Sequence, residues 1–255
     1  MQNFYPRILQ LMLASGDRLL GRAGAIEDVG VMKKWLTEED VRIERELKKL
    51  IQEKYPDHQF FSEEENDHFI DGEDVWVADP ISGTRTFIEG HPHYAIVIAH
   101  LHQQQVQFAA VYDPSVRELF TAYRGKGAFL NDRPLKVKPS SSDPKVVFAI
   151  APNWRDKMIR TDLFAEFKPF EVYRTRNSSA VNDCWVACGR FQGSVELGRD
   201  SFPAFASSLI LQEAGGIYTN IDGEANIKPS DRIFTGGDRE THEKLKPLVK
   251  KIFGG

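Results

Sequence analysis

Residues 79–84, Asp-Pro-Ile-Ser-Gly-Thr, combine residue types that can bind a metal ion and a phosphate. The carboxylate follows an apolar run at residues 75–78, the glycine permits close approach of the backbone to a ligand, and the threonine can cap a following helix. A helix N-terminus attracts anions, and Mg²⁺ is the hard cation that bridges a carboxylate and phosphate oxygens. The alternative interpretation is a plain strand–turn–helix junction in which Asp79 is only a turn residue.

The helices that position this segment are predicted from the periodicity of apolar residues. Apolar side chains recur at helical spacing in residues 8–20 and again in residues 41–51. Thr37 and Asp40 form a capping box in front of the second of these helices. The same spacing, with stops at glycine, predicts three later helices at residues 181–189, 205–214 and 241–253.

The strands are predicted from alternating or continuous apolar runs bounded by turn residues. They are expected at residues 75–78, 94–102, 106–112, 118–122, 146–150 and 217–221. The second and third of these are expected to pair as a hairpin around residues 103–105. Residues 217–221 and Ile227 are expected to flank a turn at Asp222-Gly223.

Helices mixed with hairpins of this kind indicate an α+β or layered α/β fold. Residues 138–144, rich in Pro and Ser, are the most linker-like part of the chain. We therefore predict an N-terminal α+β subdomain at residues 1–139, which carries the metal and phosphate motif, and a C-terminal α/β subdomain at residues 145–255.

The composition excludes several classes of protein. The chain has 255 residues, 33 Lys+Arg against 37 Asp+Glu, a net charge of -4 and 41% hydrophobic residues. Its longest unbroken apolar runs, such as residues 94–99, are far shorter than the ~20 residues that a membrane-spanning helix needs. The sequence has no basic run of the kind that a nucleic-acid-binding face requires. We expect a globular protein that binds neither nucleic acid nor a membrane.

The cysteines and the first residues bear on the location of the protein. Cys184 and Cys188 are the only cysteines, which excludes a disulfide framework and favours the cytoplasm. Their spacing suits one face of a helix, where a thiol behaves as a small apolar side chain, and a metal site would need further ligands. The run from Arg7 to Ala14 faintly resembles a signal peptide, but its helical spacing indicates an amphipathic first helix.

Several segments resemble landmarks of the inositol monophosphatase family, whose members are metal-dependent, lithium-sensitive phosphomonoesterases. Residues 54–64, which end in Ser-Glu-Glu, are similar to the family's segment ending in Gly-Glu-Glu. Residues 76–84 are similar to its Asp-Pro-(Ile/Leu)-Asp-Gly-Thr signature. Residues 125–131, 179–182 and 213–216 match three later landmarks. The resemblance runs in order from about residue 10 to about residue 240.

This resemblance implies a fold, an assembly and a metal ion. The family's fold is a layered α-β-α-β-α sandwich, which usually forms a homodimer and uses Mg²⁺ to hydrolyse a small phosphorylated substrate. Matched position by position, Glu63 and Asp79 correspond to ligands of the first metal ion. The backbone carbonyl of Ile81 corresponds to a third ligand of the same ion.

The resemblance also implies catalytic and substrate-binding residues. Gly83 and Thr84 correspond to the turn that binds the phosphate, and Thr84 also to a residue that orients the attacking water. Asp40 corresponds to the carboxylate paired with that threonine, and Glu63 to the acid that holds the metal at the reacting water. Glu196 corresponds to a residue that contacts substrate hydroxyls.

Two positions depart from the family's pattern. The second aspartate of the signature is Ser82 here, and a later family aspartate aligns with Pro203. Only Asp79 remains of the three carboxylates that hold the second metal ion, and Mg²⁺ needs charge to replace its water shell. We expect one Mg²⁺ site, with the second absent or very weak. Asp200 is the candidate replacement, unless Asp200-Ser201 simply caps a helix that has Pro203 in its first turn.

The other candidates each have a structural interpretation as well. Glu63 could belong to a solvated acidic loop, and Asp40 could serve only in the capping box. Thr84 could be a plain helix cap, and Glu196 an ordinary surface carboxylate.

Two His-x-His pairs complete the set of candidates. His91 and His93, and likewise His100 and His102, have the spacing that places alternate strand residues on one face. That spacing can bind a transition metal, but neither pair matches a ligand of the family. We interpret all four as ordinary strand or loop residues.

Three functions remain to be compared. The first, which we expect, is an inositol monophosphatase-like hydrolase of small phosphate monoesters, slowed because the leaving oxygen lacks a metal ion worth several kcal/mol. Arg85, next to Thr84, is a candidate cation for that oxygen. The second is a binding or regulatory module that keeps the phosphate site without efficient catalysis. The third is a 3'(2'),5'-bisphosphate nucleotidase, which residues 83–88 resemble equally.

Overall fold

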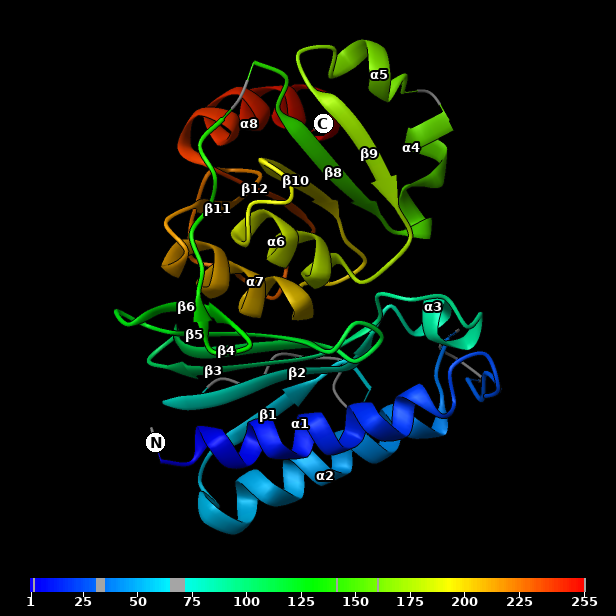
Figure 1. Ribbon diagram of the computed structural model, residues 1–255, viewed down its shortest axis with the longest axis vertical. Helices are drawn as coiled ribbons and strands as arrows, with labels where there is room; N and C mark the ends of the chain where they lie inside the picture. Colours follow the sequence, from blue (N-terminus) through cyan, green and yellow to red (C-terminus); the bar gives the residue numbers. More distant parts are fainter. Residues whose placement is uncertain (2, 31–34, 65–71, 141, 160, 255) are drawn as a thin grey trace.

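Helices and two β-sheets alternate in five layers (Figure 1). The computed structural model describes residues 1, 3–30, 35–64, 72–140, 142–159 and 161–254. Helices α1 (Tyr5–Leu20) and α2 (Glu38–Lys54) form one outer layer, α6 (Ser179–Ala187) and α7 (Phe202–Glu213) lie between the sheets, and α8 (Arg239–Phe253) is in the other outer layer. The expected α-β-α-β-α sandwich is confirmed.

The first sheet has seven strands in the order β1-β2-β3-β4-β5-β6-β7. β1 runs parallel to β2, and all the other pairs are antiparallel. Its central strands are apolar on both faces because helices cover the sheet on both sides. The strands are β1 (Gln59–Ser62), β2 (Asp74–Ser82), β3 (Ala95–His102), β4 (Gln105–Asp113), β5 (Glu118–Tyr123), β6 (Gly127–Leu130) and β7 (Arg133–Pro134).

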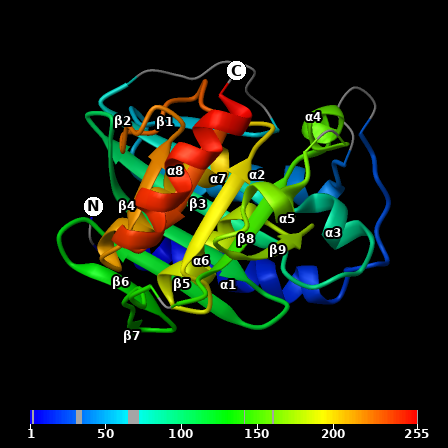
Figure 2. The same cartoon turned by 90° about the horizontal axis from the view of Figure 1, so that it is seen from above.

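The second sheet has five strands in the order β11-β12-β10-β8-β9. β8 is parallel to both β9 and β10, so these three strands end at the same edge of the sheet. Figure 2 shows α8 lying over this sheet. The strands are β8 (Lys145–Ile150), β9 (Glu171–Thr175), β10 (Gly193–Leu197), β11 (Ile217–Asn220) and β12 (Ile233–Gly237).

The segment after β11 forms the expected turn, without a second strand directly behind it. The turn at Asp222-Gly223 is present, with the amide of Gly223 donating to the carbonyl of Asn220, but Ile227 is not in a strand. β11 pairs instead with β12, which begins at Ile233. Ile227 is buried in the core, so its apolar character reflects packing and not a hairpin.

Helix packing follows the predicted periodicity. Ile8, Met12 and Leu19 of α1 are buried, and both reciprocal hydrogen bonds of the capping box join Thr37 and Asp40 at the start of α2. The core between the sheets contains side chains of α6 and α7 together with strands of both sheets. The two sheets use residues 59–134 and 145–237, on either side of the linker-like segment, and the division into subdomains stays a prediction.

The remaining elements are short. They are α3 (Thr84–Ile88), a 3₁₀ turn (Pro152–Trp154), α4 (Arg155–Ile159) and α5 (Leu163–Glu166). Cys184 is buried inside α6 and Cys188 is half-buried at its end, both as free thiols. Among the described residues, every helix is too short or too polar to cross a bilayer.

Candidate active site

A pocket of about 730 Å³ lies where the end of β2 faces the carboxyl ends of β8, β9 and β10. Ligands bind preferentially at such strand ends in sheets of this kind. Nine residues singled out from the sequence line it: Glu63, Asp79, Ser82, Gly83, Thr84, Arg85, Glu196, Asp200 and Pro203. Asp40 lies behind Thr84 within hydrogen-bond distance, and Ile81 is buried in the core beside the pocket.

The turn between β2 and α3 requires glycine. Gly83 has φ +82°, the left-handed region that favours glycine, and a Cβ at this position would lie 3.0 Å from the amide nitrogen of Ser178. The turn is therefore pressed against the start of α6, where the hydroxyls of Ser82 and Ser178 lie 2.8 Å apart. This contact joins two segments 96 residues apart in the sequence.

Two carboxylates reach the pocket from neighbouring strands. β1 runs beside β2 with Ser62 opposite Ala78, and the amide of Glu63 donates to the carbonyl of Ala78. This register puts Glu63 next to Asp79 at the same end of the sheet, and Asp79 is buried there. The rest of the acidic run, residues 65–67, lies outside the described residues.

Thr84 and Asp40 are in contact, as the sequence predicts. The hydroxyl of Thr84 lies 3.3 Å from Oδ1 of Asp40 and 2.7 Å from the carbonyl oxygen of Ile81. Oδ2 of Asp40 accepts from the amide and the hydroxyl of Thr37, so the capping role and the contact with Thr84 coexist. Burial raises the pKa of Asp40 to about 8, against the lowering effect of the Thr37 hydrogen bonds.

A sequence model of the inositol monophosphatase family matches residues 11–252. This chain belongs to the inositol monophosphatase family. Its relatives include the Nus factor SuhB of Vibrio cholerae, 34% identical over 212 residues that cover 80% of this chain and 79% of the relative. The Nus factor SuhB of Escherichia coli is 33% identical over 226 residues, covering 86% and 84% of the two chains.

Solved structures of inositol monophosphatases have the same fold. The enzyme from Anabaena is 27% identical, with a TM-score of 0.80 and coverage of 95% of this chain and 93% of that one. SaIMPase-II with bound inositol monophosphate is 27% identical, with a TM-score of 0.79 and coverage of 95% and 92%. The Thermotoga maritima enzyme, at 23% identity and a TM-score of 0.84 over 100% and 99% of the chains, supports the fold alone.

Ser82 and Pro203, the two positions at which this chain departs from the pattern of its family, also line the pocket. Ser82 uses its hydroxyl in the contact with Ser178, and Pro203 is in the first turn of α7, where it offers no ligand atom. Asp200 lines the pocket too, and its Oδ1 accepts from the amide of Phe202 at 3.2 Å. Asp200 therefore contacts the first amide of α7, whereas Ser201 at the N-cap makes no capping hydrogen bond and donates its hydroxyl to the Pro229 carbonyl.

Glu196 is not the surface carboxylate that one interpretation allowed. It is only 5% exposed, and the Tyr218 hydroxyl donates to its Oε2 at 3.3 Å. Burial, and then the nearby Asp183, raise the pKa of Glu196 well above its usual range. Asp183, which sequence reasoning missed, accepts from the Ser194 hydroxyl at 2.5 Å, and burial raises its pKa to about 6. The sequence signal for Asp183 was an acidic residue within the apolar segment predicted as a helix at residues 181–189.

Among the residues that the structure describes, five arginines line the pocket, and four of them were missed from the sequence. Arg85 is on the pocket wall, but its guanidinium donates to Glu89 at 2.7 Å and stacks over Trp35. Of the other four, one begins α4 and the rest lie near the ends of β9 and β10: Arg155, Arg174, Arg176 and Arg199. Strands β9 and β10, together with α4, thus deliver positive charge to one edge. The Arg-Thr-Arg triplet at residues 174–176 was the available signal in the sequence.

Proposed function

We propose that this chain is a Mg²⁺-dependent phosphomonoesterase for small phosphorylated substrates. The proposal rests on one observation: Glu63, Asp79 and the Gly83-Thr84 turn line the same pocket, and Asp40 lies behind Thr84. These residues supply negative charge for a cation, and the turn supplies backbone donors for a phosphate.

The donor set suits one Mg²⁺ and argues against a second. Glu63, Asp79 and the carbonyl of Ile81 offer only oxygen atoms, which is what a hard cation prefers. Bound there, Mg²⁺ would activate a water molecule and neutralise charge on the phosphate. A second ion would meet the Ser82 hydroxyl and Pro203 where the family has carboxylates, so we expect it to bind weakly or not at all.

The other residues orient the reactants. The hydroxyl of Thr84, placed by Ile81 and Asp40, is suited to align the attacking water. Gly83 permits the left-handed turn that presents the backbone amides of the Gly83-Thr84 turn to the phosphate. Glu196, whose pKa burial raises well above its usual range, can hydrogen-bond with substrate hydroxyls from the second sheet.

The charge of the pocket favours a substrate with more than one anionic group. The carboxylates Glu63 and Asp79 together match the charge of one Mg²⁺. The four guanidinium groups of residues 155, 174, 176 and 199 then exceed the charge of Asp200 and of a single phosphate. A sugar or nucleoside bisphosphate would use this surplus better than inositol monophosphate, which keeps the bisphosphate nucleotidase alternative open.

A second candidate function is regulation without efficient turnover. The loss of the carboxylates at Ser82 and Pro203 favours it, since a leaving-group metal is worth several kcal/mol. Relatives with 33–34% identity carry the name Nus factor SuhB, a name that does not designate a phosphatase. In this case the pocket would bind a phosphorylated ligand and release no phosphate.

Phosphate release separates these functions. Inositol phosphate, fructose bisphosphate and adenosine bisphosphate are each incubated with the protein, with and without Mg²⁺. A phosphatase releases phosphate only with Mg²⁺ and loses at least 100-fold activity on Glu63→Gln, whereas Glu53→Gln, an exposed carboxylate of α2, leaves the rate unchanged. Binding of these ligands by calorimetry without any phosphate release would establish the regulatory function instead.

We also infer that the protein is a cytoplasmic homodimer, as the family resemblance implies. Light scattering of the purified chain tests the assembly. A single species with twice the mass of the chain supports the dimer, and a monomer at micromolar concentration contradicts it.

A further inference from the structure

Four potential metal ligands lie together at the end of the first sheet away from the pocket. His58 comes just before β1, Asp74 begins β2, and His100 and His102 are on β3. β2 and β3 pair with Asp74 opposite His102 and Trp76 opposite His100, so these side chains share one face of the sheet. Asp74 is five residues before Asp79 on the same strand, which separates the two sites by about 17 Å.

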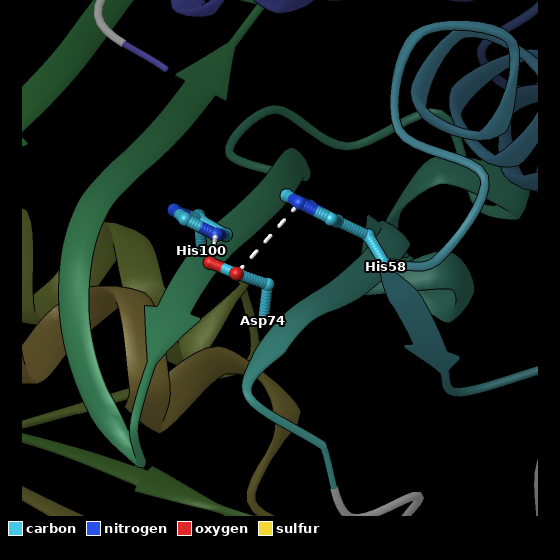
Figure 3. A group of neighbouring side chains, drawn as sticks. All are labelled: His58, Asp74 and His100. Atoms are coloured by element: carbon cyan, nitrogen blue, oxygen red, sulfur yellow. Dashed lines mark hydrogen bonds and ion pairs between the residues drawn. The ribbon is translucent and has the colours of Figure 1, made fainter.

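The Asp74 carboxylate is at the centre of the group. Figure 3 shows His58 and His100 approaching it from two sides. Nε2 of His100 lies 2.9 Å from Oδ1 of Asp74, Nδ1 of His102 lies 3.1 Å from the same oxygen, and Nε2 of His58 lies 3.7 Å from Oδ2. The ligand atoms of His58, Asp74 and His100 all lie within 4.8 Å of one another.

We propose that His58, Asp74, His100 and His102 bind a transition-metal ion of the Zn²⁺ class. Imidazole and carboxylate are ligands that Zn²⁺ accepts, and four of them make the closed tetrahedral shell of a structural site. Bonds of about 2.1 Å at tetrahedral angles put ligand atoms about 3.4 Å apart. The distances from Asp74 to the three histidine nitrogens, 2.9, 3.1 and 3.7 Å, bracket that value. The ligand atoms of His58, Asp74 and His100 already lie within 4.8 Å of one another, and His102, whose side chain is 44% exposed, must rotate toward them to complete the shell.

Metal binding requires each imidazole to present a lone pair. Asp74 is an acceptor, so without metal the facing nitrogens of His100 and His102 carry the protons. His100 can move its proton to Nδ1, which lies 3.0 Å from the Tyr5 hydroxyl, an oxygen that can accept it. The side chain of His102 is 44% exposed, and water can take the same role there. Each of these shifts moves a proton from one ring nitrogen to the other and releases none.

The indole of Trp76 disfavours metal coordination by His58. Its Nε1–H donates to Nδ1 of His58 at 3.1 Å, which favours the tautomer with the proton on Nε2. Coordination through Nε2 moves that proton to Nδ1, where it faces the indole N–H, so this hydrogen bond must break. Removing the indole donor should therefore tighten metal binding, an effect that a purely hydrogen-bonded cluster does not predict.

Such a site would join elements that are distant in sequence. It would tie β1, β2 and β3 together at one end, and through Tyr5 it would reach α1 on the face of the sheet. Binding to the folded state alone raises stability as the free metal concentration rises. A role in stability, separate from catalysis, follows from the distance to the pocket.

The test is Zn²⁺ titration of the full chain by calorimetry. The chain carries Glu63→Gln and Asp79→Asn, which remove the carboxylates proposed for Mg²⁺, and is first treated with a chelator. One Zn²⁺ per chain is expected, with Co²⁺ giving the absorption bands of a tetrahedral complex. His100→Ala and Asp74→Asn should weaken binding at least 100-fold, and Tyr5→Phe about 10- to 100-fold. His91→Ala, an exposed histidine outside the group, should change nothing.

Two further variants test whether His102 and His58 are ligands. His102→Ala removes an exposed side chain, so it tests the site even if variants at buried positions unfold. Trp76→Phe, checked for folding by circular dichroism, should bind Zn²⁺ more tightly. The proposal is overturned if the chain binds no Zn²⁺ in this background, or if His102→Ala and His91→Ala bind it equally. Unchanged affinity in folded Trp76→Phe removes His58 from the ligand set.

Discussion

The hydroxyl of Thr84 lies between Oδ1 of Asp40, at 3.3 Å, and the carbonyl oxygen of Ile81, at 2.7 Å. A hydroxyl has one proton, so it cannot donate to both oxygens at once. Burial raises the pKa of Asp40 to about 8, and its Oδ2 is already used by Thr37, so a proton on Oδ1 can be donated to Thr84. Thr84 then donates to Ile81, and its orientation is fixed from both sides.

This arrangement predicts that the hydroxyl of Thr84 matters more for catalysis than for stability. Thr84→Ala should lower kcat for phosphate release by about 100-fold or more, the lower range for a positioned proton-transfer group. Thr84→Ser keeps the hydroxyl and should stay within about tenfold of the parent protein, since each 1.4 kcal/mol is a factor of ten. Steady-state phosphate release under saturating substrate measures both.

Thr86→Ala is the matched control for Thr84. Thr86 is on the same short helix, is equally buried, and donates its hydroxyl to the Arg176 carbonyl at 2.7 Å. Thr86→Ala loses one hydrogen bond and Thr84→Ala loses two, each worth about 1 kcal/mol of stability, so their melting temperatures should differ by only a few degrees. Similar melting temperatures with very different kcat values support the catalytic role, and equal losses of activity refute it.

The raised pKa of Asp40 predicts a pH dependence of stability. The folded protein holds a proton on Asp40 up to about pH 8, whereas the unfolded chain releases it near the ordinary value of 3.8. The favourable contribution is therefore complete below pH 3.8 and is lost as the pH rises toward 8. Each unit of pKa difference corresponds to about 1.4 kcal/mol.

Asp40→Asn isolates this effect, because asparagine imitates the protonated acid and does not titrate. The variant should become more stable relative to the parent as the pH rises from 4 to 8. The difference between their free energies of unfolding should grow by several kcal/mol over this range, at about 1.4 kcal/mol per pKa unit. Urea denaturation of both proteins without divalent cations measures the difference. Parallel curves across this range would mean that Asp40 is ionised in the folded protein.

Much of this site was predictable because its ligands follow local patterns. Asp79, Gly83 and Thr84 are neighbours in the chain, and the capping box at Thr37 and Asp40 is visible in four residues. Periodicity alone located α1, α2, α6, α7 and α8 to within a few residues.

What the sequence did not reveal depends on contacts between distant segments. The hydrogen bond between Ser82 and Ser178 and the pairing of β11 with β12 arise only when the two sheets assemble. The same assembly buries Glu196 and brings Arg174 to the pocket with the other arginines. No periodicity within one segment encodes which strand end faces another.

The turn at Gly83 predicts a large effect for a small substitution. Gly83→Ala should lower the free energy of unfolding by about 1–2 kcal/mol for the left-handed backbone alone. Crowding against the Ser178 amide, 3.0 Å from the added Cβ, should increase the loss and weaken phosphate binding. Gly215→Ala is the control, because Gly215 has φ +85° but no atom within 4 Å of its Cβ position. Chemical denaturation should rank Gly83→Ala as the more destabilised, and equal losses would mean that α6 yields to the added methyl group.

The departures at Ser82 and Pro203 predict that a second metal site can be rebuilt. In the double variant Ser82→Asp, Pro203→Asp, both new carboxylates would line the pocket near Asp79, and the one at residue 203 would be in the first turn of α7, where acidic residues are favourable. We expect one additional Mg²⁺ per chain by calorimetry, turnover raised at least tenfold, and greater sensitivity to lithium. A gain of 1.4 kcal/mol in transition-state stabilisation is enough for that increase.

The amide variant Ser82→Asn, Pro203→Asn has similar side-chain sizes without the charge and should gain neither metal nor turnover. Unchanged metal stoichiometry in the aspartate variant would show that these two positions do not face a common ion.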